Sequence, residues 1–295
     1  MVDQNERVGL MARMRVVTNV GITLGTVPAG IALAGHGDSF TVLLLANAAS
    51  YVLAGGIVAS LPLDPNAVTD AKVSRALLIP SPATAAMISI NGLMSLWVVI
   101  LNIGLPLWIV SATNAPRALV AILYATNTVV AIIAQSRVAR WVATYRRAAD
   151  AQRIDGMLLA ACCGCLAAST LTNRTISTIV LIVGVLCLSG GELLSVSSAW
   201  EVSFKLAPEG RSAEFFATYG HGRAGSQVAG PVLITAAVLA LGVPGWIALG
   251  ALFILGGAAT PALARRALAQ PLIDRRPPAV PPTHSPITGT SVFAT

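Results

Sequence analysis

Long apolar segments dominate this sequence and constrain its fold more than any motif does. Eight segments are almost free of charge, and each is long enough, at about 20 residues, to cross about 30 Å of hydrocarbon as an α-helix. They are continuous rather than alternating, which favours helices over the strands of a membrane β-barrel. The sequence therefore predicts an all-α integral membrane protein. The predicted spans are 16–35, 40–62, 83–110, 116–136, 156–172, 177–202, 222–242 and 245–263.

Composition excludes a water-soluble globular fold. Hydrophobic residues make up 55% of the chain and charged residues 11%, whereas soluble domains carry about 25% charged residues. A soluble protein of this length could not remove so much apolar surface from water. The first span is loosely similar to a secretory signal, but Asn19 and Pro28 interrupt it, so we expect a retained membrane helix.

Charge placement tests this topology independently. With the N-terminus in the cytoplasm, the eight spans put 17 of the 19 lysines and arginines in cytoplasmic segments and leave only Arg117 and Arg174 outside. The positive-inside rule predicts this asymmetry. We therefore expect a multi-pass protein of the cytoplasmic membrane with both termini in the cytoplasm. The net charge of +7 then reflects orientation in the bilayer, and no nucleic-acid partner is expected.

The spans fall into a two-plus-six arrangement. An N-terminal helix pair covers 1–63, and a more polar cytoplasmic connector covers 64–82. A six-helix bundle follows over 83–263. The remainder, 264–295, is rich in proline and lacks apolar periodicity, which predicts a disordered cytoplasmic tail.

Residues 188–192 read LSGGE, which matches the signature loop of ABC-transporter ATPases. Such an ATPase also needs a phosphate loop of the form G-x-x-x-x-G-K-[ST]. The two lysines of this chain, Lys72 and Lys205, follow Ala71 and Phe204, so that loop is absent. The match is therefore coincidental, and we expect neither an enzyme nor a bound cofactor.

Glu192 instead lies inside the predicted span 177–202, where an ionised carboxylate is costly and protonation is favoured. Ser189 and Ser195 lie three residues to either side, so their hydroxyls share one helical face with the carboxylate. Two interpretations remain open. Glu192 either binds a proton or substrate, or it is a structural carboxylate that is hydrogen-bonded to a neighbouring helix or lies at a cytosolic vestibule.

Other side chains within the spans are candidates for lining a shared cavity. Each amide alone is more often a hydrogen bond between helices than a ligand. The candidates are Asn91, Trp97, Asn102, Asn127 and Gln135.

The cysteines and histidines show no metal-ligand spacing. Cys162 and Cys163 are adjacent on one predicted helix and therefore point in different directions. We expect no metal site, and the cysteines are interpreted as small packing residues.

The first span combines small residues with a helix breaker. Gly21 and Gly25 form a G-x-x-x-G pair, which permits close helix contact. Pro28 and Gly30 then loosen the backbone at mid-membrane, where neighbouring helices must compensate. Close packing explains the pattern, and a hinge is the alternative.

Two short stretches, one that contains Glu192 and one that follows it, resemble a known family. Residues 191–194 read GELL and 206–209 read LAPE. Together they are similar to the tenth helix and following loop of the major facilitator superfamily of secondary transporters, particularly its drug-efflux branch. Residues 21–30 resemble the Gly/Pro-rich antiporter motif of that family's fifth helix, which is partly kept as GTVPAG at 25–30.

A basic stretch extends the resemblance. Residues 136–140 read SRVAR and resemble the D-R-x-G-R-R loop between helices eight and nine, in which Arg137 and Arg140 would act in cytoplasmic gating. The family's aspartate is replaced by Ser136 and its glycine by Ala139.

The resemblance implies that 16–62 corresponds to helices five and six of the usual twelve, and 83–263 to helices seven to twelve. The first four helices have no counterpart, which leaves either a remnant or a start upstream of Met1.

The resemblance implies proton-coupled export of a small molecule by alternating access, with the bilayer, the substrate and protons as partners. The alternative is a non-transporting remnant or accessory membrane protein, associating with a second copy or with another polypeptide.

Overall fold

The computed structural model describes residues 17, 21, 39–60, 78–171, 173–208, 211–269 and 273–274. These residues are helical apart from short connections and one pair of two-residue strands, which confirms the predicted all-α class. The helices are α2 (Ser39–Ser60), α4 (Pro82–Met94), α5 (Trp97–Val99), the π-helix η1 (Ile100–Gly104), α6 (Leu105–Ala112), α7 (Leu119–Trp141), α8 (Tyr145–Ala168), the 3₁₀-helix η2 (Ser169–Leu171), α9 (Arg174–Leu206), α10 (Ser212–Ala236), the π-helix η3 (Ala237–Leu241) and α11 (Val243–Ala269).

Among the described residues, five helical segments are long and apolar enough to cross a membrane, and this supports the predicted membrane class. α2 contains a shorter apolar segment, Leu44–Ile57, and α10 is not among the five. The predicted span 16–35 lies outside the described residues except for Val17 and Gly21, both helical. The count of eight spans and the two-plus-six arrangement therefore stay predictions. The five segments are Pro82–Ala112, Leu119–Trp141, Tyr145–Leu171, Arg174–Leu206 and Val243–Ala269.

Several helices extend past the predicted spans. α7 continues to Trp141, α8 begins at Tyr145 rather than at 156, and α11 continues to Ala269. The predicted spans end where charged residues begin, but a helix continues through charged residues that reach the membrane surface. Residues 264–269, predicted to begin a disordered tail, are thus helical.

The connector and tail segments meet in a short strand pair. Strands β1 (Leu78–Ile79) and β2 (Ile273–Asp274) are antiparallel, with Leu78 opposite Asp274. The beginning of the bundle is therefore tied to the segment that follows its last helix.

Local sequence signals set the helix starts. Ser81 caps α4, where its Oγ accepts a hydrogen bond from the Thr84 amide at 3.2 Å, and Pro82 occupies the first turn. Asn173 caps α9 in the same way, accepting from the Ile176 amide at 3.0 Å. Gly242 adopts a positive φ of 62° between η3 and α11, a conformation that favours glycine.

The third predicted span is a broken helix. α4 ends at Met94, α5 is a single turn, and η1 inserts a π-helical segment before α6. Pro106 lies in the first turn of α6 and has no amide hydrogen to donate to the preceding turn. Such π segments occur where an extra residue is accommodated in a helix.

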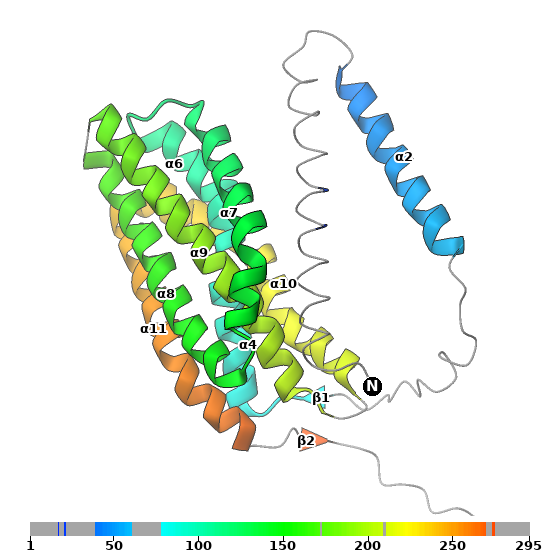
Figure 1. The fold of residues 1–295 in the computed structure, drawn as a ribbon. Coiled ribbons are helices and arrows are strands. Elements are labelled where there is room, and N and C mark those ends of the chain that lie inside the picture. The colour runs from blue at the N-terminus through cyan, green and yellow to red at the C-terminus, as the bar shows by residue number, and fades with distance from the viewer. Residues whose placement is uncertain are drawn as a thin grey trace, which may run out of the picture.

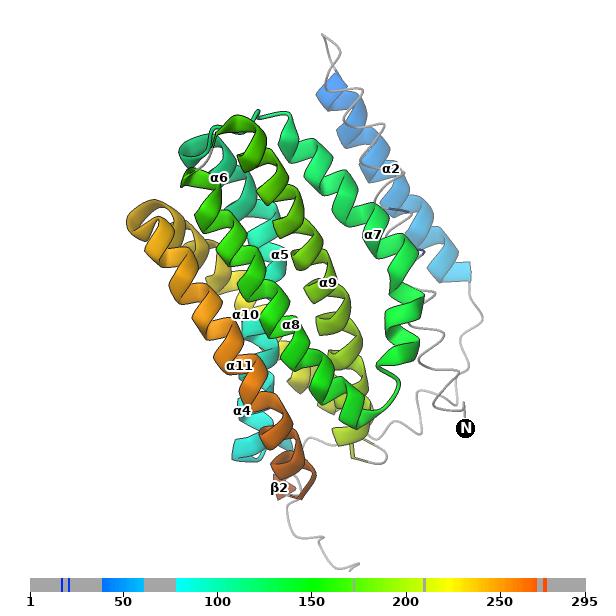
Figure 2. The ribbon, with the colours of Figure 1, turned by 60° about the vertical axis from the view of Figure 1, so that its left-hand side comes forward.

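Four long helices lie side by side in the order α7, α9, α8, α11, and α4 and α10 pack behind them (Figures 1 and 2). The buried side of α7 is one stripe with a spacing of four residues, which includes Asn127 and Gln135. Close glycine contacts hold two other pairs together. A Cβ on Gly92 of α4 would lie 2.6 Å from the Gly222 carbonyl oxygen of α10, and one on Gly156 of α8 would overlap the Phe253 carbonyl oxygen of α11.

The bundle has two apolar clusters along its length. One includes Trp108, Leu123 and Trp246, and Trp108 Nε1 donates to the Leu166 carbonyl oxygen at 2.7 Å. The other includes Met87 and Phe215. α8 and α9 contribute to both clusters, and most of their buried polar residues lie near the junction.

Candidate functional site

Glu192 is buried between α9 and α7, with 5% of its surface exposed. Asn127 Nδ2 donates to Glu192 Oε2 at 2.8 Å and to Ser189 Oγ at 3.0 Å. Ser189 in turn donates to the Val185 carbonyl oxygen at 2.8 Å. The structure thus brings together two predicted site residues, Glu192 and Asn127, through the serine on the predicted polar face. This geometry fits both open interpretations of Glu192. The carboxylate is hydrogen-bonded to a neighbouring helix, and it is also placed where it could bind a proton or a substrate.

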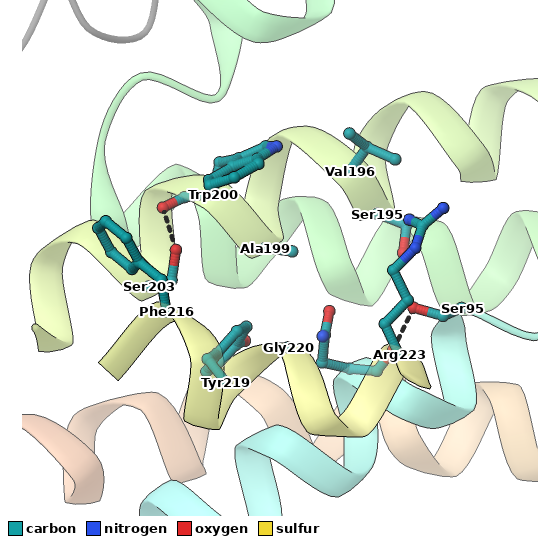
Figure 3. Close-up of a pocket in the computed structure, with 11 residues that line it drawn as sticks. Ser95, Ser195, Val196, Ala199, Trp200, Ser203, Phe216, Tyr219, Gly220 and Arg223 are labelled. Carbon is teal, nitrogen blue, oxygen red and sulfur yellow. Dashed lines mark hydrogen bonds between the residues drawn. The ribbon is translucent and has the colours of Figure 1, made fainter. Parts of the chain in front are cut away.

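A cavity of about 250 Å³ lies between α4, α9 and α10. Figure 3 shows its walls: hydroxyl groups and aromatic rings of α9 face the beginning of α10, and Ser95 closes one side. Two of the hydroxyls are used within their own helices, since Ser95 Oγ donates to the Asn91 carbonyl oxygen and Ser203 Oγ donates to the Trp200 carbonyl oxygen. The lining residues are Asn91, Ser95, Ser195, Val196, Ala199, Trp200, Ser203, Phe216, Tyr219, Gly220 and Arg223.

Arg223 is the basic residue in this lining. Its guanidinium carbon lies 5.6 Å from the ring centroid of Trp97, a cation–π arrangement that joins α10 to α5. Trp97 is therefore behind the cavity wall, whereas Asn91 lies on it. Both are predicted site residues, and both are buried.

Aromatic rings cluster at one end of the cavity, and two of them, Trp200 and Phe216, line it. The Phe204 and Phe216 ring centroids are 4.9 Å apart, and the Trp200 centroid lies 5.9 Å from Phe204 and 6.3 Å from Phe216. Such a cluster offers an apolar contact surface to a ligand, and the hydroxyls and Arg223 offer polar contacts.

The carboxylate and the cavity share one face of α9 at different positions along its length, since Ala199 and Ser203 of the lining lie seven and eleven residues after Glu192. Glu192 contacts α7 and is absent from the cavity lining, whereas Ser195, one turn further along, lines the cavity. The two features are therefore adjacent on one helix without being one pocket.

Asn102 does not join the candidate site. It is exposed, and its Nδ2 donates to the Val98 carbonyl oxygen within its own helix at 2.8 Å. Tyr124 of α7 donates to Asn102 Oδ1 at 3.2 Å and to the Leu101 carbonyl oxygen at 2.9 Å. Asn102 is thus part of a contact between α7 and η1, and it is not among the residues that line the cavity between α4, α9 and α10.

The basic residues predicted to form a gating loop are helical. Arg137 and Arg140 are exposed in the last turns of α7, and the connection to α8 comprises only 142–144. Their gating role stays a prediction. Gly21 is helical, and Gly25, Pro28 and Gly30 lie outside the described residues.

A further buried carboxylate, Asp155 of α8, was not predicted from the sequence. Both Asp155 and Gln152 have 0% exposure, although the predicted span began only at 156. A signal was present, because the buried residues of α8 recur at alternating spacings of three and four, a stripe that passes through Gln152 and Asp155. Extending that periodicity across the charged residues would have placed both side chains inside the bundle.

No group of three His, Cys, Asp or Glu side chains suited to a metal ion occurs among the described residues. The four cysteines are free thiols: Cys162 and Cys163 are buried, and Cys165 and Cys187 are half-buried. Comparisons with known proteins add no assignment. The chain matches no protein-family model, no curated protein and no solved structure.

Proposed function

We propose that the protein is a secondary active transporter of the major facilitator type that exports a small molecule by alternating access, driven by protons. The observation that carries this proposal is the double use of α9. One face of the helix holds the buried carboxylate of Glu192 against Asn127 and, from one turn further along, lines a cavity between helices. Intramembrane carboxylates are costly and mark ion or substrate pathways. A proton on Glu192 can therefore affect a ligand bound about one helical turn away.

The cavity chemistry favours a particular class of substrate. Trp200 and Phe216 provide aromatic contacts, Ser195 provides a hydroxyl, and Arg223 provides a positive charge. Like charges repel across a low-permittivity cavity, so Arg223 disfavours a cationic ligand. The expected substrate is a small aromatic molecule that is neutral or acidic.

The broken helix supports the same proposal. Secondary transporters place their sites beside discontinuous helices near the middle of the membrane. α5 and η1 form such an interruption, and Trp97 of α5 contacts Arg223 of the cavity. A conformational change in α5 or η1 would therefore reach the cavity through the contact between Trp97 and Arg223.

Proteoliposomes with an imposed pH gradient test the proposal. The full chain should move a fluorescent aromatic acid against its concentration gradient, and it should move an aromatic amine of similar size more slowly. Glu192→Gln should abolish gradient-driven movement while binding, followed by quenching of tryptophan fluorescence, persists. Glu214→Gln is the matched control, because Glu214 pairs with Arg211 at the start of α10, away from Glu192. Unchanged transport by Glu192→Gln would remove its coupling role.

A second candidate, an accessory protein that binds another membrane helix, is favoured by α2. Where the side chains of α2 are described, they are exposed all round the helix, and Asn47 is among them. An amide facing lipid is costly, and a partner helix could satisfy it. Asn47→Cys in a cysteine-free chain should cross-link in the membrane if α2 pairs with a second copy. Wild-type protein that inserts normally, transports none of the probes and cross-links at this position would favour this candidate.

A further inference from the structure

Three side chains at the junction of the two apolar clusters present buried polar atoms without ordinary hydrogen-bond partners. Both carboxyl oxygens of Asp155, both amide atoms of Gln152 and the hydroxyl of Tyr219 form no hydrogen bond with the described residues. The Ser195 hydroxyl, 2% exposed, lies near the Asp155 carboxyl group without meeting hydrogen-bond geometry. The Gln152 amide likewise lies near the Tyr219 hydroxyl without meeting that geometry. Buried polar atoms of native proteins are almost always satisfied, so an exception calls for a bound ion or water.

These groups lie close together because of helix geometry. Gln152 and Asp155 are three residues apart on the buried face of α8, which places them side by side. Ser195 of α9 lies opposite, since a Cβ on Gly191, one turn away on α9, would approach Asp155 Oδ1 to 2.9 Å. Ser195 and Tyr219 also line the cavity between α4, α9 and α10, so the cluster borders that cavity.

The donor atoms are those that a hard cation prefers. Asp155 offers carboxylate oxygens, Gln152 a carbonyl oxygen and Ser195 a hydroxyl oxygen, and oxygen ligands suit alkali and alkaline-earth ions. The Tyr219 hydroxyl can accept a hydrogen bond from Gln152 Nε2, which would turn the carbonyl end of the amide toward the ion. Tyr219 is therefore a positioning residue rather than a ligand.

The single negative charge of the cluster favours a monovalent ion. Asp155 is the single carboxylate of the cluster, and it forms no ion pair with a described lysine or arginine. Arg223, the basic residue of the cavity lining, lies over the Trp97 ring on α5. A monovalent ion neutralises one carboxylate, whereas a divalent ion would leave a net positive charge inside the bundle, which is costly.

We propose that Asp155, Gln152 and Ser195 form an intramembrane binding site for a small monovalent cation, Na⁺. Na⁺ coordinates several oxygen atoms at once, whereas a proton on Asp155 would satisfy only part of the cluster. The site does not depend on the proposed transport, because cation binding can be measured on protein that transports nothing. It also differs from the Glu192 network, which uses the side of α9 that faces α7.

Thermal unfolding of the purified full chain in detergent tests the site. NaCl should raise the unfolding temperature in a saturable manner at constant ionic strength, with choline chloride as the replacement salt. KCl should raise it less at equal concentration. No saturable effect of Na⁺ on the wild-type protein would overturn the proposal, as would a stability that follows pH alone and is indifferent to Na⁺, which would identify a proton instead.

Variants locate the site. Asp155→Asn keeps the side-chain shape, removes the charge and should abolish the Na⁺-dependent shift. Asp150→Asn is the matched control, because Asp150 lies on the same helix with its side chain exposed, and it should retain the full shift. A shift that persists in Asp155→Asn would contradict the assignment.

A milder variant covers the case in which Asp155→Asn does not fold. Ser195→Ala removes one oxygen ligand and keeps the carboxylate, so binding of radioactive sodium by the purified protein should weaken severalfold. Tyr219→Phe should weaken it to a smaller extent. Unaltered sodium binding in Ser195→Ala would place the ion elsewhere.

Discussion

Asn127 and Glu192 form a buried hydrogen bond between α7 and α9, in which Nδ2 of the amide donates to Oε2 of the carboxylate at 2.8 Å. α7 is the first helix of the row α7, α9, α8, α11, and its contact with the bundle runs mainly through α9. This bond is therefore an important polar link between α7 and the rest of the bundle.

Replacing the amide should loosen that link. We expect Asn127→Ala to lower the free energy of unfolding by about 1 kcal/mol, the size typical of hydrogen bonds between membrane helices. Unfolding in mixed micelles of increasing denaturing detergent measures the change. Asn102→Ala is the control, because Asn102 is exposed and Tyr124, its partner on α7, keeps the Leu101 carbonyl oxygen as an acceptor, so the loss should be smaller. Equal losses would show that the Asn127 bond adds nothing specific.

α8 and α11 approach each other too closely for a side chain at Gly156. A Cβ there would overlap the Phe253 carbonyl oxygen and lie 3.2 Å from the Gly257 Cα, both backbone atoms that cannot rotate away. Gly156→Ala should therefore destabilise the protein by about 1–3 kcal/mol.

Gly164→Ala, on the same helix, provides the comparison for Gly156. No atom lies within 4 Å of its added Cβ, so the change should be neutral or stabilising by up to about 1 kcal/mol. Thermal unfolding of both variants measures the difference. A destabilising Gly164→Ala together with a neutral Gly156→Ala would contradict the packing of these two helices.

The contact between α4 and α10 should be equally sensitive to an added methyl group. A Cβ on Gly222 would overlap the Ile88 carbonyl oxygen and lie 3.1 Å from the Gly92 amide nitrogen, so Gly222→Ala must separate the helices that bound the cavity. We expect lower thermal stability and weaker binding of aromatic acids, followed by tryptophan fluorescence. Gly225→Ala on the same helix has open space around its Cβ and should leave both measurements unchanged. Wild-type ligand binding in Gly222→Ala would mean that α4 and α10 do not bound the binding cavity.

Membrane orientation follows from the predicted topology. In a cysteine-free chain, a membrane-impermeant thiol reagent applied to intact cells should label Asn114→Cys, which lies exposed between α6 and α7. Ala213→Cys, exposed at the start of α10, should be labelled only after the cells are opened. The reverse pattern would invert the orientation drawn from the positive charges.

The helical class and most helix positions could be predicted because apolar runs of bilayer length leave few alternatives. Helix ends were less predictable, since a hydropathy criterion stops at charges that a helix readily carries to the membrane surface. α8 illustrates this, as its first turns contain Arg146 and Arg147 and still belong to the helix.

The candidate site was only partly predictable, because residue type shows that a polar group is buried but not which helix it meets. Glu192 could be singled out as an isolated carboxylate, whereas its pairing with Asn127 depends on α7 lying next to α9. Asn102 has the same residue type as Asn127 and lies elsewhere, on η1. Asp155 lies at the edge of an apolar run, and only its place in the repeating stripe of α8 reveals its burial.

The π-helical segment Ile100–Gly104 sets the rotation about the helix axis of the segment that follows it, Leu105–Ala112. It holds one residue more than an α-helical turn would, and one residue corresponds to about 100° of rotation about the axis. Trp108 and Ile109 owe their inward direction to that extra residue, and with it Trp108 reaches the Leu166 carbonyl oxygen. Deletion of one residue here would turn the following segment, Leu105–Ala112, by about that angle and carry the Trp108 indole away from the Leu166 carbonyl oxygen, while Pro82–Met94 kept its register.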